Sequence, residues 1–301
     1  MTPAYVELYN SGRLSRCAEE LFERLRRCSL CPHRCGVNRV EGERGLCRSG
    51  IGPIVSSFNA HFGEESPLVG RCGSGTIFFT NCNLGCIFCQ NYDISHLGRG
   101  EEVSYHRLAE MMVSLQGKGC HNINFVTPTH MNYAIVKALL EAVPMGLRVP
   151  LVYNSGGYDA VETLSILEGV YDIYMPDFKY MDQETAGRLS GAPDYPDAAM
   201  AAIREMHRQV GDLVMDRNGI ARRGLLVRHL VLPNNIAATD RVINFIADLS
   251  PDTYINIMDQ YRPEYRAGEW FDLKRRVTLK EYDDAVEHAR ASGLTRIDGL
   301  I

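Results

Sequence analysis

The sequence lacks long apolar segments. No stretch approaches the roughly 20 apolar residues that are needed to cross a bilayer. The longest candidate, Gly224 to Pro233, is interrupted by Arg228 and His229. The segment Met1 to Glu7 shows no basic region followed by an apolar one, so no secretory signal is expected. These absences predict a cytoplasmic protein with no membrane partner.

An excess of positive charge is also lacking. The 301 residues include 32 Lys and Arg against 37 Asp and Glu, a formal net charge of -5, which argues against a protein that coats nucleic acid. Neither low-complexity tracts nor internal repeats are evident. Hydrophobic residues make up 45% of the chain, enough for a large core, so general disorder is excluded.

From about residue 76 onward, short apolar runs alternate with segments of helical period. Strands are expected at 76–80, 123–127, 149–154, 172–178, 225–232 and 253–258. Helices are expected at 105–116, 133–141, 160–167, 198–209, 240–248 and 279–290. Ser104, Asp159 and Thr278 stand where three of these helices begin, and Glu281 completes a capping box with Thr278.

Six successive β-α units predict an α/β fold with a parallel sheet, because strands joined by a helical crossover run in the same direction. Six units are too few for a closed eight-stranded barrel, so a partial (β/α)6 barrel is expected, with a flat doubly wound sheet as the alternative. In either fold the functional site lies at the carboxyl ends of the strands. We expect this core to span residues 76–301, including a C-terminal helix.

Residues 1–75 form a second predicted region. A helix is expected at 14–27, followed by a segment rich in Cys, Arg and Gly that cannot bury a core of its own. Four thiols in this segment, Cys28, Cys31, Cys35 and Cys47, are the complement for a structural zinc or a fully ligated iron-sulfur cluster. Spacing does not separate these two alternatives, and zinc is slightly favoured because the segment needs a metal to fold.

Three more thiols, Cys82, Cys86 and Cys89, lie within eight residues directly after the strand expected at 76–80. Such a loop can hold one cubane [4Fe-4S] cluster through three sulfurs and leave one iron open for another ligand. The alternatives are a zinc knuckle or a group of buried thiols. Cys17, Cys72 and Cys120 stand alone, and each is expected to be a small buried side chain.

The spacing Cys82-x3-Cys86-x2-Cys89, with Phe88 before the last thiol, resembles the radical S-adenosylmethionine (SAM) superfamily. The resemblance implies a partial (β/α)6 barrel and a [4Fe-4S] cluster whose open iron is chelated by SAM. It also implies cleavage of SAM to a 5'-deoxyadenosyl radical that abstracts a hydrogen atom from a substrate. Segments 28–39, 45–47, 89–91, 126–130 and 256–263 extend the resemblance to the PflX-type homologues of pyruvate formate-lyase activating enzyme.

Polar residues at the other strand ends are the candidate SAM contacts. Relatives commonly carry Gly-Gly-Glu after the second strand, where this chain has Thr127-Pro128-Thr129-His130. Pro176-Asp177-Phe178-Lys179 resembles the Asp-x-Lys of the activating enzymes, and an Arg228 inside an apolar strand suits a carboxylate. The full set of candidates is Phe88, Thr127, Thr129, Asn154, Ser155, Asp177, Lys179, Arg228, Asn256 and Gln260.

Two functions are therefore open. The first is a radical SAM enzyme that uses a low-potential electron donor such as flavodoxin or ferredoxin and acts on an unidentified substrate, of which a glycine of a partner protein is one example. The second is a non-catalytic zinc-binding or electron-transfer protein. The arginine-rich face around residues 24–48 is a candidate docking site for an acidic electron donor or substrate protein.

Overall fold

The structure is a computed structural model, and it describes residues 2–298. All six expected strands are present and pair in parallel in chain order. They are β2 (Ser74–Phe79), β4 (Ile123–Val126), β5 (Leu151–Ser155), β6 (Ile173–Pro176), β8 (Ala221–Leu230) and β9 (Tyr254–Met258). The mostly parallel sheet is consistent with the expected partial barrel, and it is extended by further strands.

Three further strands extend this sheet. β1 (Ile54–His61) pairs antiparallel with β2, and β3 (Glu101–Glu102) pairs with β1. β7 (Val214–Met215) forms a hairpin with β8. The division of the chain at residue 75 stays a prediction, and β1 from the first part joins the same sheet as the second part.

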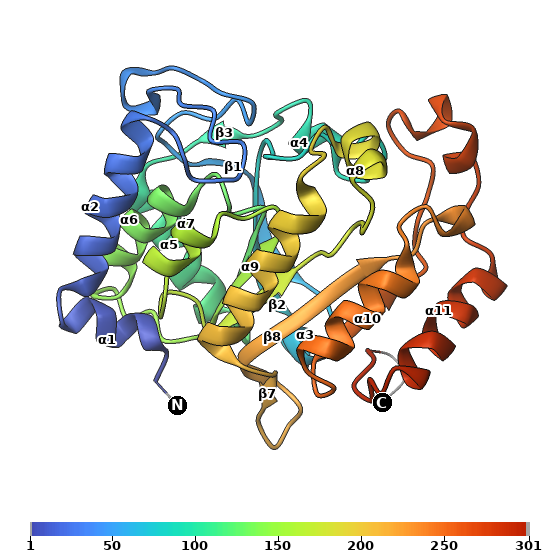
Figure 1. Cartoon of the computed structure of the whole chain (residues 1–301). Helices are drawn as coiled ribbons and strands as arrows, with labels where there is room; N and C mark the ends of the chain where they lie inside the picture. The colour runs from blue at the N-terminus through green and yellow to red at the C-terminus, as the bar shows by residue number, and fades with distance from the viewer. Residues whose placement is uncertain (1, 299–301) are drawn as a thin grey trace.

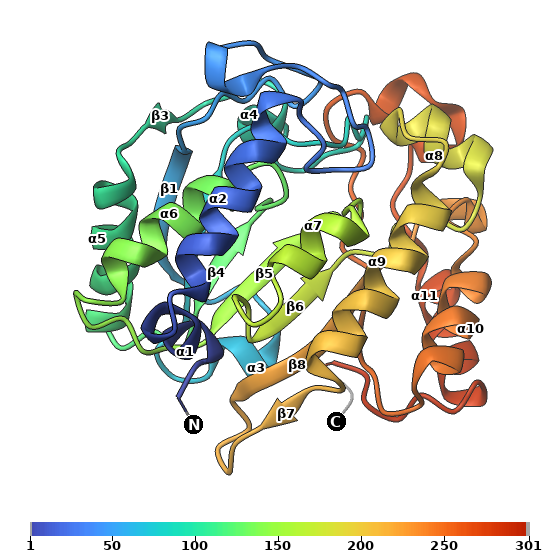
Figure 2. The same ribbon diagram turned by 60° about the vertical axis from the view of Figure 1, so that its left-hand side comes forward.

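Helices cover the outer face of the sheet (Figure 2). The predicted helices appear as α2 (Arg13–Arg26), α5 (Tyr105–Gly117), α6 (Asn132–Ala142), α7 (Val161–Ile166), α9 (Tyr195–Val210), α10 (Thr239–Leu249) and α11 (Leu279–Ala291). The additional helices are α1 (Ala4–Asn10), α3 (Ser66–Val69), α4 (Tyr92–Ser95) and α8 (Gln183–Ser190). Within residues 2–298 there are also four short 3-10 turns: Arg39–Glu41, Pro233–Asn235, Ala267–Glu269 and Phe271–Leu273.

Two of the three expected helix starts are confirmed. The Ser104 side chain accepts the N–H of Arg107, and Thr278 and Glu281 form the reciprocal capping box at α11. The expectation for Asp159 is wrong, because Ala160 precedes α7 without a side-chain cap and the Asp159 carboxylate is used elsewhere. Side chains outside α7 donate hydrogen bonds to this carboxylate, so it does not cap the helix.

The two faces of the sheet are buried against different elements. Residues such as Phe125, Tyr153 and Leu225 pack outward against the helices, and their neighbours in sequence face the other way. On that inner face a second buried cluster combines Leu68 of α3 with side chains of the strands, among them Val152, Ile173, Met175, Leu226 and Tyr254. The short helix α3 therefore fills the concave side, and both views place it beside β8.

The two chain ends lie at one end of the molecule, and the loops that carry most cysteines lie at the other (Figure 1). This second end also holds α4, α8 and the segment that follows α2. The carboxyl ends of the parallel strands point towards it. In the described residues, no helix combines the length and the apolarity that a membrane crossing requires.

Candidate functional site

The three-cysteine loop begins where β2 ends. Asn81 adopts a left-handed conformation (φ 65°), which turns the chain out of the strand immediately before Cys82. Cys82, Cys86 and Cys89 then line one cavity at the carboxyl edge of the sheet. Burial raises the pKa of the Cys82 and Cys86 thiols, so without a metal both are neutral.

Each of the three sulfurs has a polar neighbour within hydrogen-bond range. The backbone N–H of Leu84 donates to Sγ of Cys82 across 3.3 Å. The hydroxyl of Ser190 lies 3.0 Å from Sγ of Cys86, and the hydroxyl of Ser95 lies 3.1 Å from Sγ of Cys89. Sequence analysis missed both serines: Ser190 is distant from the motif in sequence, and Ser95, six residues after Cys89, is outside the motif pattern.

Helix α8 binds the main chain of the three-cysteine loop. The N–H groups of Gly85 and Ile87 donate to the carbonyls of Ser190 and Leu189, at 3.1 and 2.9 Å. These carbonyls belong to the last turn of α8, where intrahelical partners run out. Asp182, which accepts the N–H of Thr185, and the left-handed Gly191 mark the two ends of α8 and are the signals that would have found it.

The same cavity brings together most of the candidate ligand contacts from other strands. It is lined by eight of the ten, namely Phe88, Thr127, Asn154, Ser155, Asp177, Lys179, Arg228 and Gln260. Thr129 and Asn256 are not among its lining residues. Thr127 has a positive φ of 60°, rare for a β-branched residue, at the point where β4 opens into the cavity.

Asp177 lies between two cations in this cavity. Its Oδ2 is 2.7 Å from Nζ of Lys179, and its Oδ1 is 2.8 Å from Nη2 of Arg228. Burial raises the pKa of Asp177, but the charges of Arg228 and Lys179 outweigh burial and hold its pKa below the ordinary value. All three groups are therefore charged at neutral pH.

Arg228 also contacts two glutamates that sequence analysis did not single out. Its Nη1 lies 3.8 Å from Glu64 and 3.7 Å from Glu65, in the segment that leads into α3. Asn256 donates to Oε1 of Glu65 across 3.0 Å, which explains why its side chain turns away from the cavity. The other oxygen of Glu65, Oε2, is buried and has no partner in the described residues.

Thr129 takes part in a buried network instead of the cavity. Its hydroxyl, the phenol of Tyr153 and the hydroxyl of Ser155 all donate to Asp159, at 2.7, 2.7 and 2.6 Å. This network fixes the loop after β5, where Gly157 takes a φ of +78° against the carbonyl of Asp177. Ser155 lines the cavity, yet its proton is directed away from it.

Two comparisons with known proteins bear on the family of this chain. The sequence model of the radical SAM superfamily matches residues 76–217. The uncharacterized protein MJ0674 of Methanocaldococcus jannaschii is 37% identical over 279 residues, which are 90% of this chain and 76% of that protein. The chain belongs to the radical SAM superfamily. Membership implies a [4Fe-4S] cluster and SAM as co-substrate, which makes the protein an enzyme.

The donor set of the cavity fits a radical SAM cluster. Three cysteines on one loop face a common space, and a donor beside each sulfur stabilises the thiolate form that binds iron. The radical SAM domain also carries charged and polar side chains in the same cavity, which a zwitterionic ligand requires.

The four N-terminal cysteines lie close to one another and next to the cluster loop. Burial, with a smaller contribution from the nearby Cys47, Cys28 and Cys35, raises the pKa of Cys31 to about 12. The Nε2 of His33 is 2.8 Å from the carbonyl oxygen of Asn83, inside the three-cysteine loop. A radical SAM cluster in that loop would therefore be next to the N-terminal cysteine segment.

The described residues do not include a set of three or more Cys, His, Asp or Glu side chains placed closely enough for one metal ion. The structure thus does not support the expected second metal site. Of the three isolated cysteines, Cys120 is buried and Cys17 is half-buried. The expectation for Cys72 is wrong, because the turn that carries it is exposed.

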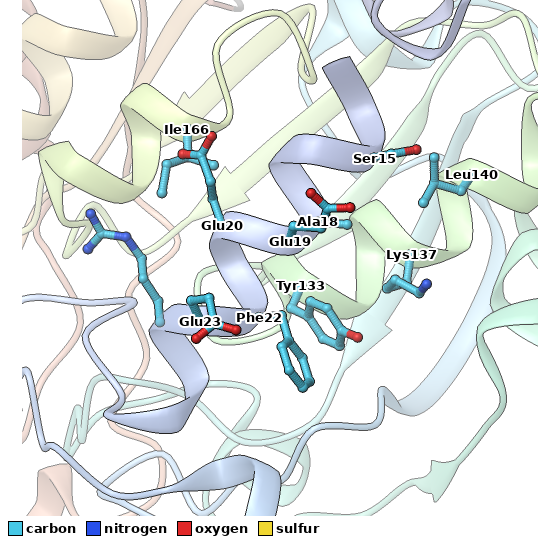
Figure 3. A pocket seen from close by; sticks show the side chains of 11 residues that line it. Ser15, Ala18, Glu19, Glu20, Phe22, Glu23, Tyr133, Lys137, Leu140 and Ile166 are labelled. Carbon is cyan, nitrogen blue, oxygen red and sulfur yellow. The ribbon is translucent and has the colours of Figure 1, made fainter. Parts of the chain in front are cut away.

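A larger cavity, of about 820 Å³, lies away from the radical SAM site, in the outer helical layer. Figure 3 shows side chains of α2, α6 and α7 around it, with Phe22 beside Tyr133 at a ring distance of 5.6 Å. Glu19, Glu23 and Lys137 give its wall charges of both signs. None of the candidate site residues lines this cavity.

Proposed function

We propose that this radical SAM enzyme cleaves SAM at a [4Fe-4S] cluster held by Cys82, Cys86 and Cys89 and abstracts a hydrogen atom from a substrate. The observation that carries the proposal is the meeting of three thiols with the Asp177–Lys179 ion pair in one cavity. When bound, the cluster supplies the single electron that breaks the sulfonium bond.

The chain's own residues have separate roles in this proposal. Lys179 and Asp177 present both charge signs to the amino-acid part of SAM, and Arg228 holds Asp177 in place. Phe88 is buried edge-on against Tyr180 and Tyr261, which gives the cavity an apolar wall. Thr127, Asn154 and Gln260 supply hydrogen-bonding groups around the same space.

The test is anaerobic reconstitution with iron and sulfide, reduction with dithionite, and measurement of 5'-deoxyadenosine. The wild type should form it, and Cys86→Ala should lose both the iron spectrum of this site and the product. Cys72→Ala is the matched control, since this exposed thiol lies outside the cavity, and it should keep both. A wild type with a full cluster and no SAM cleavage overturns the proposal and favours the non-catalytic alternative.

We propose a glycine in a partner protein as the substrate, as in the activating enzymes that the PflX-type motifs resemble. A glycine-containing peptide panel with deuterium at the glycine α-carbon tests this. Deuterium in 5'-deoxyadenosine, absent with alanine-substituted peptides, supports the proposal. Transfer from none of the peptides, with active enzyme, counts against it.

We further propose that Cys28, Cys31, Cys35 and Cys47 bind zinc or a second [4Fe-4S] cluster. The support is the four-thiol spacing in the sequence and the buried Arg39, which is 2% exposed. Its positive charge opposes the effect of burial, which raises the pKa of Cys28. An iron and zinc count on anaerobically purified Cys31→Ala against wild type decides between the metals. An unchanged content of both would remove the site from consideration.

The electron donor is proposed to be a low-potential cytoplasmic protein of the flavodoxin or ferredoxin class. Arg48 donates to the carbonyls of His96 and Ser95, at 2.6 and 2.9 Å, so it joins the arginine-rich segment to α4 beside the cluster loop. Product formation with reduced flavodoxin in place of dithionite, weakened by added salt, would support this docking.

A further inference from the structure

We infer that Ser190 sets the reduction potential of the cluster by donating a hydrogen bond to the ligand Cys86, as the end of a chain of hydroxyl groups that begins at Tyr180. The inference rests on the proposed function, because it concerns the same three-cysteine cluster. It assigns a function to Ser190 at the end of α8, a helix that was not among those expected from the sequence.

The geometry of the chain is continuous. The Tyr180 hydroxyl lies 3.0 Å from Oγ of Ser190, and Oγ of Ser190 lies 3.0 Å from Sγ of Cys86. The exposed fractions of Tyr180, Ser190 and Cys86 are 0%, 2% and 8%, so bulk water does not compete for these bonds. Buried hydrogen bonds to a charged atom are stronger than exposed ones.

Ligation fixes the direction of both bonds. A cysteine that binds iron is a thiolate and has no proton to give, so the Ser190 hydroxyl must donate to it. The second lone pair of Ser190 is then free to accept from Tyr180. Tyr180 is held in this position by edge-on packing with Phe88 and Tyr195.

The bond acts more strongly on the reduced cluster than on the oxidised one. Reduction adds one electron, taken here from dithionite, and no bond to Ser190 forms or breaks in the step. The added negative charge is shared with the thiolate sulfurs, and a donor at a sulfur stabilises it. Loss of the donor therefore lowers the midpoint potential and makes the cluster harder to reduce.

Ser190→Ala isolates this effect from the docking of α8. The bonds from Gly85 and Ile87 to α8 use main-chain carbonyls, which alanine retains. The matched control is Ser165→Ala, which removes an exposed hydroxyl bonded to the carbonyl of Val161 in α7. Tyr180→Phe is the second variant, since it removes the hydroxyl that polarises Ser190 and keeps the Ser190 hydroxyl itself.

The experiment is a redox titration of the reconstituted full-length protein, followed by electron paramagnetic resonance of the reduced cluster. At the wild-type midpoint, the ratio of reduced to oxidised cluster should fall at least about threefold in Ser190→Ala. It should fall less in Tyr180→Phe and stay unchanged in Ser165→Ala. Iron content and the oxidised spectrum should be the same in all four proteins.

The outcomes distinguish a failure of the proposed function from a failure of the role assigned to Ser190. A wild type that binds no cluster overturns the proposed function. A wild type with a normal cluster, and Ser190→Ala or Tyr180→Phe with an unshifted potential, overturns only the role of the hydroxyl chain. If Ser190→Ala fails to assemble a cluster, Tyr180→Phe alone decides, and an unshifted potential there counts against the inference.

Discussion

Nε of Arg228 donates to Oδ1 of Asp177 across 2.8 Å, and Nη2 of the same guanidinium donates to Asn154 across 2.7 Å. The two bonds join β8 to the residues at the ends of β6 and β5. Arg228 thereby fixes the relative positions of three neighbouring strands at the floor of the cavity. Arg228, a candidate from the sequence for binding the carboxylate of SAM, therefore also binds protein side chains.

Asp177→Asn should destabilise the metal-free protein by about 3 kcal/mol, because it leaves the cations of Lys179 and Arg228 without their shared counter-charge. The side chains of all three groups are less than one-fifth exposed, at 18%, 17% and 17%. The free energy of unfolding from urea titration at pH 7 measures the effect.

Asp216→Asn is the control for this prediction. Asp216 pairs with Arg222 at 2.6 Å on the surface, with side chains 22% and 39% exposed, so its loss should destabilise the protein clearly less than the loss of Asp177. Equal losses in the two variants would contradict the structural role of the buried pair.

The parallel strands could be predicted from the sequence because their apolar runs are bounded by turns and separated by helical periods. Elements without such a pattern could not. Helix α8 has only eight residues, Gln183–Ser190, with a polar and small composition that suggests a loop. Helix α3 has four residues, and its Leu68 is buried in a cluster with side chains of the sheet strands, which only the fold brings together.

The cysteines and the pair Asp177 and Lys179 could be found because fixed spacing carries their chemistry. Glu65 and Ser190 could not, since only the fold brings them to Arg228 and Cys86 from distant parts of the chain. Asp159 was misassigned because the hydroxyls of Thr129, Tyr153 and Ser155 donate to its carboxylate, which is then not available to cap α7.

His229 predicts a loss of stability in mild acid. Its Nδ1 is 2.6 Å from the carbonyl oxygen of Phe178 and its Nε2 is 2.9 Å from the hydroxyl of Thr239, so the ring is neutral with the proton on Nδ1. Burial lowers the pKa of His229 to about 4. Between pH 6.5 and about 4, His229 is therefore protonated in the unfolded chain but neutral in the folded protein.

The contribution of His229 is full above pH 6.5 and is lost as the pH falls towards 4, by up to about 3 kcal/mol. His229→Gln should lack this part, so the difference in unfolding free energy between wild type and variant should shrink from pH 7 to pH 4. Burial also lowers the pKa of His130 to about 4. His130 is present in wild type and variant, so its contribution cancels in the difference between their unfolding free energies. A difference that does not vary with pH would show that His229 is not the group.

Gly157 lies in the loop after β5, in close contact with Asp177 and Tyr195. Its φ of +78° disfavours any other residue, and a Cβ there would overlap the carbonyl oxygen of Asp177 and lie 2.9 Å from the hydroxyl of Tyr195. The Tyr195 hydroxyl donates to that same carbonyl, so neither neighbour can move without losing a buried hydrogen bond. Gly157→Ala should therefore cost at least about 2 kcal/mol beyond the cost of the backbone conformation alone.

Gly146→Ala measures that backbone cost by itself, because Gly146 has a φ of +97° and a Cβ there would meet nothing within 4 Å. We expect a loss of about 1 kcal/mol for Gly146→Ala in urea titrations, against a clearly larger loss for Gly157→Ala. Since Gly157 presses on the residue that pairs with Lys179, its variant should also weaken SAM binding, and Gly146→Ala should not. Equal stabilities of the two variants would mean that the loop after β5 yields without disturbing Asp177.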